Sequence, residues 1–207
     1  MQLFISKYLS IDANRIAVDG KVLLEHNDGG LVAEDAYRAL AISYPKFFKM
    51  DLLCKWATLS AECLLKNDSN KEQSQRYVYE GLDKNAIAVV LMTASGCLDV
   101  DKKYLHSMET VASPALFVYT LPNIMLGEIC IRHGFKGDQL SMVSEAPDVE
   151  ELHFWVSDLL QNRGMDACLC GWVEAVEGKQ EIRLIWVDKK SGVSFSRDNL
   201  TKYLKPL

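Results

Sequence analysis

The residues best suited to chemistry follow one apolar segment. Residues 86–92, AIAVVLM, contain no polar side chain and are rich in β-branched residues, which is typical of a strand buried on both faces. The segment runs into Thr93-Ala94-Ser95-Gly96-Cys97, a small-residue turn at a strand end, where open α/β sheets bind ligands. Ser95 and Cys97 are therefore candidate nucleophiles for acyl transfer or hydrolysis. The turn lacks the G-x-S-x-G spacing of a nucleophile elbow, and the sequence identifies no activating base.

Metal sites and disulfides have little support in the sequence. The four histidines are scattered, without the H-E-x-x-H spacing that would join two on one helix face. Cys168 and Cys170 have no second pair to complete four zinc ligands, so we interpret them as packed strand residues. Asp99-Val100-Asp101 lacks the glycine and the distal glutamate of a calcium loop, which favours a capping or solvated role. We expect no metal and no cofactor.

Length, charge and hydropathy narrow the class of protein. With 207 residues, 49% of them hydrophobic, we expect a single domain over 1–207. The net charge of -5 and the mixing of acidic with basic residues argue against nucleic acid as a partner. No apolar run reaches the roughly 18 residues needed to span a bilayer. Because the six cysteines lie in apolar segments, as reduced thiols do, we expect a cytoplasmic protein.

Periodicity predicts the elements that position these residues. Asp19-Gly20 lies between two apolar runs and predicts a hairpin. Asp148 can cap a helix ending at Gly164, with Glu151 reaching back to it. Because strands alternate with helices, we expect an α/β fold with a mostly parallel five-stranded sheet, helices on both faces and, as an open alternative, an antiparallel edge. The other predicted elements are helices at 51–66 and between Pro122 and Gly134, a polar connection at 67–85, and strands at 140–143, 166–176 and 181–190.

Three blocks of sequence follow one another in a fixed order. The strand and turn of 86–97 come first, and the second block contains Pro114, Leu121-Pro122-Asn123 and the run IRHGFKG at 131–137. The third block is DACLCGWVEA at 166–175. Over roughly residues 86–176 the chain resembles the amino-terminal half of the β-ketoacyl synthases of the thiolase superfamily, and the middle block is the most specific part of the match.

The resemblance implies a thiolase-like half-domain whose nucleophile is lost. In that family the nucleophilic cysteine stands between a short strand and a long buried helix, where the helix dipole stabilises a thiolate. Counting from Gly137 puts Ala146 in register with that cysteine, and neither Glu145 nor Pro147 restores a thiol. The family draws two catalytic histidines from a second half, and no histidine follows His153 here. We therefore expect no condensation by the chain alone.

Two functions from different classes follow. The resemblance implies a non-catalytic ketosynthase-like partner in fatty-acid, polyketide or aryl-polyene-type assembly, associating with a ketosynthase subunit or an acyl carrier protein. The alternative is an acyltransferase or thioesterase-like enzyme that uses Cys97 or Ser95. A third interpretation is an α/β domain that associates with itself, because a missing second half leaves a large apolar face. We expect a homodimer or heterodimer with Phe117, Val118 and Tyr119 at the interface.

Overall fold

Three strands at the centre of the sheet are buried on both faces. β4 (Ile87–Thr93) is buried throughout, and β6 (Ala167–Val176) and β7 (Lys179–Asp188) are buried over most of their length. The sequences of β4 and of most of β6 are apolar without regular alternation, which is why the strand at β4 was predictable. Strands of this kind require a layer of side chains on each face of the sheet.

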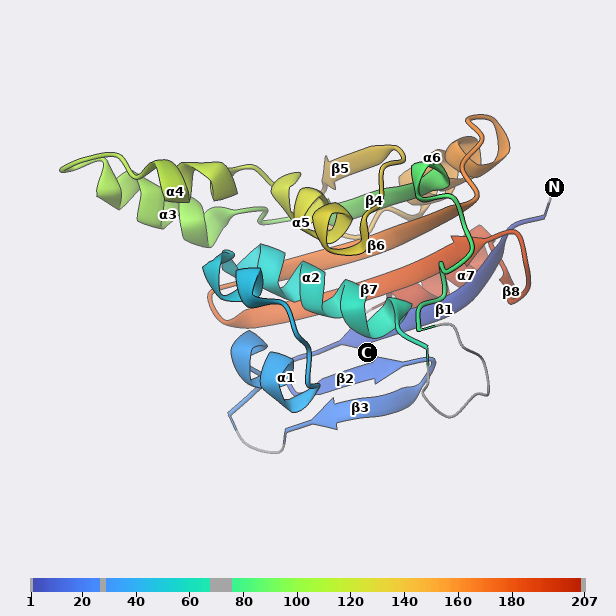
Figure 1. Cartoon of the computed structure of the whole chain (residues 1–207), viewed down its shortest axis with the longest axis horizontal. Helices are drawn as coiled ribbons and strands as arrows, with labels where there is room; N and C mark the ends of the chain where they lie inside the picture. The colour runs from blue at the N-terminus through green and yellow to red at the C-terminus, as the bar shows by residue number, and fades with distance from the viewer. Residues whose placement is uncertain (1, 27–28, 68–75, 206–207) are drawn as a thin grey trace.

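Helices provide both layers (Figure 1). α2 (Leu52–Leu65) and α5 (Ile124–His133) pack on one face, and α6 (Val149–Gln161) and α7 (Arg197–Leu204) pack on the other. Alternate residues of β4 belong to the two hydrophobic cores, as the two-residue period of a strand requires. The prediction of an α/β fold with helices on both faces is confirmed.

The computed structural model describes residues 2–26, 29–67 and 76–205. Its other strands are β1 (Phe4–Ile11), β2 (Arg15–Val18), β3 (Lys21–Glu25), β5 (Gln139–Val143) and β8 (Val193–Ser194). Its other helical segments are α1 (Ala33–Ala39), α3 (Leu98–Ser107), α4 (Pro114–Phe117) and the 3-10 turns η1 (Pro45–Lys49), η2 (Lys84–Ala86) and η3 (Val118–Thr120). The predicted connection at 67–85 lies partly outside the described residues.

The prediction of a mostly parallel five-stranded sheet was wrong. Across the described residues the sheet is mixed and has eight strands, in the order β3-β2-β1-β7-β6-β4-β5, with β8 beside β1. In this part of the chain the only parallel pairs are β4 with β5 and β4 with β6. The two-residue turn Glu177-Gly178 is too short for a crossover, so β6 and β7 must be antiparallel. The amino-terminal strands join through β1, which pairs antiparallel with β7, and the hairpin at Asp19-Gly20 is confirmed.

Helix ends follow their local signals. The Asp148 carboxylate accepts a hydrogen bond from the Glu151 N–H at 3.0 Å and caps α6. The carboxylate of Glu151 does not return to the cap as predicted, because it accepts from the Trp155 indole at 3.3 Å. Gly134 adopts a left-handed conformation with φ 75° and ends α5. α5 begins at Ile124 rather than at Pro122, which lies in the preceding turn.

A buried ion pair joins the two helices on one face. The carboxylate of Glu62, on α2, accepts hydrogen bonds from the Arg132 Nε of α5 at 2.9 Å and from the Tyr77 hydroxyl at 2.7 Å. Burial alone would raise the pKa of Glu62, but these two bonds outweigh it and hold the pKa below its usual range. Removing either partner would leave a buried charge undercompensated.

His133 lies beside this pair at the end of α5. Its side chain is 1% exposed, and its Nδ1 shares a 3.1 Å hydrogen bond with the Tyr79 hydroxyl. The pKa of His133 is lowered to about 4, mainly by burial and also by the neighbouring cations Arg132 and Lys84, against the opposing effect of Glu62. The fold therefore favours the neutral imidazole.

The stability of the protein should fall as the pH drops from about 6.5 toward 4. Over this range His133 becomes protonated in the unfolded chain but stays mostly neutral in the folded chain. The unfolded state therefore binds more protons than the folded state. This linkage lowers the free energy of unfolding by about 2 kcal/mol between pH 7 and 5. The pKa of His153 is also lowered by burial, so this residue too lowers the free energy of unfolding as the pH falls. His153 is less buried than His133.

Urea unfolding at pH 7 and pH 5 measures this difference for the wild type, His133→Gln and His153→Gln. The His133 variant should lose most of the pH dependence, and the His153 variant should keep most of it. An unchanged pH dependence in His133→Gln would contradict the assignment.

Candidate functional site

The predicted strand, loop and helix around Ala146 are present. β5 pairs parallel with β4, so the carboxyl ends of both strands lie side by side. The Ser144 N–H donates to the Thr93 carbonyl at 3.1 Å and fixes the start of the loop 144–148 that leads into α6. Ala146 is exposed in this loop, and its carbonyl accepts from the Ser144 hydroxyl at 2.8 Å. Ala146, which the sequence comparison predicted to stand in place of a nucleophile, therefore exposes a methyl group in this loop.

The turn after β4 is held by one carboxylate from the neighbouring strand. Glu174 accepts hydrogen bonds from the Ala94 N–H at 2.8 Å, the Ser95 N–H at 3.1 Å and the Thr93 hydroxyl at 3.0 Å. The last paired residues of these strands are Met92 and Trp172, so Glu174 stands one pleat beyond the ladder, against the turn. The sequence contained this glutamate in its third block, but its role becomes visible only through the strand pairing.

The two alternative nucleophiles lie in the turn after β4, in different surroundings. Cys97 is 5% exposed and belongs to the core around α2. Burial raises the pKa of Cys97 to about 12, and the negative charges of Asp51 and Asp101 add to the shift. Ser95 is half-buried, with its backbone N–H bound to Glu174. A thiol this weakly ionised is a poor nucleophile near neutral pH.

The described ranges contain neither a cluster of metal ligands nor a single helix that could span a membrane. In these ranges no three His, Cys, Asp or Glu side chains gather where they could hold a metal ion. No single described helix is long and apolar enough to cross a membrane, although the bent pair Pro114–Thr120 and Ile124–His133 passes on length and composition. Cys168 and Cys170 are fully buried strand residues, as predicted.

Apolar side chains are exposed on an arm, residues 98–121, that carries α3, α4 and η3. The arm projects beyond the body of the protein, at the left in Figure 1. Of the three predicted interface residues, Phe117 is 54% and Val118 52% exposed, whereas Tyr119 is half-buried and donates to Glu128. The other large exposed hydrophobic residues of the arm are Leu98, Leu105, Met108, Val111 and Leu121.

The helical face formed by α6 and α7 is mostly polar. Its charged residues include Glu150 on α6 and Arg197 on α7, which form an exposed ion pair. Among the described residues of these two helices, Phe154 is the one large hydrophobic side chain that is exposed. The resemblance predicted a long buried helix here and a large apolar face left by a missing half. Seven of the fourteen large exposed hydrophobic side chains in the described part of the chain lie on the arm.

Comparison with known proteins identifies the fold. No protein-family model and no curated protein matches the sequence. "The ishigamide ketosynthase/chain length factor" superimposes with a TM-score of 0.63 at 16% identity, covering 91% of this chain and 62% of that chain. A ketosynthase (ApeO) in complex with its chain length factor (ApeC) from Xenorhabdus doucetiae gives 0.57 at 12%, covering 93% and 81%. The fold is that of ketosynthases and chain length factors.

A third solved structure matches to a similar extent. It is AntDE:AntF, a type II PKS acyl-carrier protein in complex with its ketosynthase bound to the hexaketide, with a TM-score of 0.58 at 12% identity and coverage of 91% and 62%. The chain thus spans about three fifths of the length of two of these neighbours. At these identities the likeness establishes the thiolase-like fold and leaves activity and partners to be argued from the site.

Replacing Glu174 by glutamine should destabilise the protein by about 2 kcal/mol, because an amide N–H₂ would face backbone donors that now bind a carboxylate. Glu177→Gln is the matched control, since Glu177 is exposed and its pairing with Lys102 contributes little. Urea unfolding at pH 7 compares the two variants. Equal losses of stability would show that Glu174 does not hold the turn.

Proposed function

We propose that this chain is a non-catalytic ketosynthase-like subunit that acts beside a complete ketosynthase in polyketide, fatty-acid or aryl-polyene-type assembly. The observation that carries the proposal is Ala146 in an otherwise retained strand, loop and helix. An alanine side chain cannot form the thioester that covalent condensation requires, so this route is closed. The ketosynthase and chain length factor complexes among the structural neighbours support a partner role.

The surface distribution supports a ketosynthase subunit as the partner. Among the described residues β5 pairs on one side only, with β4, so its other edge exposes backbone donors and acceptors. The arm adds exposed apolar side chains, including Phe117 and Val118, on a protein whose opposite helical face is polar. Unpaired strand edges and apolar patches of this kind mark protein interfaces. We propose that the ketosynthase binds the arm and the β5 edge.

The proposal also includes a second partner and a location in the cell. An acyl carrier protein is the second partner we propose, because one structural neighbour is a carrier protein in complex with its ketosynthase. A cytoplasmic location belongs to the proposal as well, since all six cysteines are buried free thiols.

Replacing Phe117 by aspartate should weaken assembly with a ketosynthase of the same organism by at least about tenfold. Phe117 is 54% exposed on the arm, and a buried unpaired charge would oppose docking there. Phe154→Asp is the control, because Phe154 is 59% exposed on the polar face of α6. Native mass spectrometry or light scattering of the mixed proteins measures the complex.

Two outcomes would refute this assembly. One is a chain that stays monomeric at micromolar concentration in the presence of the ketosynthase. The other is a Phe154→Asp variant that loses the complex while Phe117→Asp retains it, which would place the interface on the opposite face. A stable homodimer without affinity for the ketosynthase would also count against the proposed partner.

A further inference from the structure

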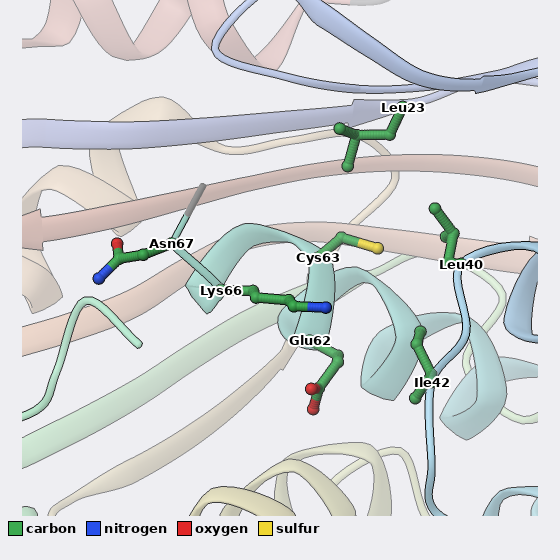
Figure 2. A pocket seen from close by; sticks show the side chains of 7 residues that line it. All are labelled: Leu23, Leu40, Ile42, Glu62, Cys63, Lys66 and Asn67. Atoms are coloured by element: carbon green, nitrogen blue, oxygen red, sulfur yellow. The ribbon is translucent and has the colours of Figure 1, made fainter. Parts of the chain in front are cut away.

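A crevice far from the Ala146 loop opens at the carboxyl end of α2. It lies among α2, the hairpin strand β3 and the segment that follows α1, and has a volume of about 190 Å³. Figure 2 shows Leu40, Ile42 and Cys63 converging on one side while the Lys66 side chain reaches in from the other. The lining residues are Leu23, Leu40, Ile42, Glu62, Cys63, Lys66 and Asn67.

One wall of the crevice is apolar and firmly held. Leu23, Leu40 and Ile42 are half-buried and pack against the main hydrophobic core. Ala41, between two of them, has φ 50°, a left-handed conformation that side chains other than glycine seldom adopt. The Ile42 N–H donates to the Tyr37 carbonyl of α1 at 3.2 Å and holds the segment in this shape. The wall is therefore organised before any molecule binds.

The opposite end of the crevice carries a net positive charge. The Lys66 side chain is exposed, and none of the described residues forms an ion pair with its ammonium. The negative charge of Glu62 is already matched by Arg132 and Tyr77. The partial negative charge at the carboxyl end of α2 is offset by Lys7, whose ammonium donates to the Lys66 carbonyl at 2.6 Å. The Lys66 ammonium could therefore pair with the negative charge of a bound anion.

We propose that this crevice binds a small amphiphilic monocarboxylate, with its carboxylate paired to Lys66 and its aliphatic tail against Leu23, Leu40, Ile42 and Cys63. Its volume exceeds the about 150 Å³ cavity that accommodates benzene in an engineered protein, so a tail of about five carbons fits. The site is independent of the proposed ketosynthase partnership, because none of its lining residues belongs to the arm or to β5.

The donors in the crevice favour a carboxylate over a phosphate. Phosphate sites use arginine forks or the free N–H groups of a helix N-terminus, whereas this site lies at a helix C-terminus and offers a single lysine. One ammonium balances one carboxylate charge. A cationic amphiphile would meet Lys66 without a free carboxylate to pair with, since Glu62 is already bonded.

Hexanoate is the probe, and NMR titration of the full chain is the test. We expect saturable shifts of amide signals near residues 23, 40–42 and 62–66, with hexan-1-ol and hexylamine binding at least about tenfold more weakly. Lys66→Gln should weaken hexanoate binding about tenfold and leave hexan-1-ol unchanged. Lys103→Gln, an exposed lysine lining a different crevice between α2 and the arm, should bind hexanoate like the wild type.

The proposal is overturned if hexanoate gives no saturable shift, if its shifts map elsewhere, or if hexan-1-ol binds equally well. Equal losses in Lys66→Gln and Lys103→Gln would also overturn it, because they would indicate attraction to surface charge alone. Inorganic phosphate that binds more tightly than hexanoate at the same residues would contradict the choice of a carboxylate. Both substitutions are at exposed positions, so the variants should fold.

Discussion

The carboxylate of Glu174 is the contact on which the functional end of this protein depends. It extends one pleat past the ladder between β4 and β6 and binds the backbone of Ala94 and Ser95. Through Thr93 the same turn receives the Ser144 N–H, which fixes the start of the loop that carries Ala146. It also sets the point from which α3 and the arm leave the body. One partly buried carboxylate–amide contact thereby positions both the loop that carries Ala146 and the start of the arm.

The surface of the protein is divided between two very different faces. Helices α6 and α7 present ion pairs such as Glu150 with Arg197, so this face is compatible with water. Phe117 and Val118 on the arm are instead exposed apolar groups. Among the described residues one edge of β5 is also unpaired. This division is what the proposed partner role requires, with Ala146 exposed between β5 and α6 and exposed apolar side chains on the arm.

Local features of the fold could be predicted from the sequence, and long-range features could not. Asp148, Gly134 and the Asp19-Gly20 turn act on neighbouring backbone groups, so their types and spacing reveal what they do. The pairing of β1 with β7 joins the two ends of the chain, and no local pattern encodes it. The sheet was therefore predicted with too few strands and too many parallel ones.

The candidate site shows the same difference between local and long-range features. Ala146 could be placed by counting within one block, and the structure puts it between β5 and α6. Glu174 and the Glu62–Arg132 pair depend on residues about 80 and 70 positions away, so their roles appear only once the strands and helices are assembled. The crevice beside Glu62 likewise combines three separate segments of the chain.

A reconstituted condensation assay with acyl and malonyl carrier proteins tests the central claim most directly. The reactions compare this chain alone, a ketosynthase of the same organism alone, and the two proteins together. The account predicts no β-ketoacyl product from the chain alone, and a product yield or chain length from the mixture that differs from that of the ketosynthase alone. Robust condensation by the isolated chain would contradict it.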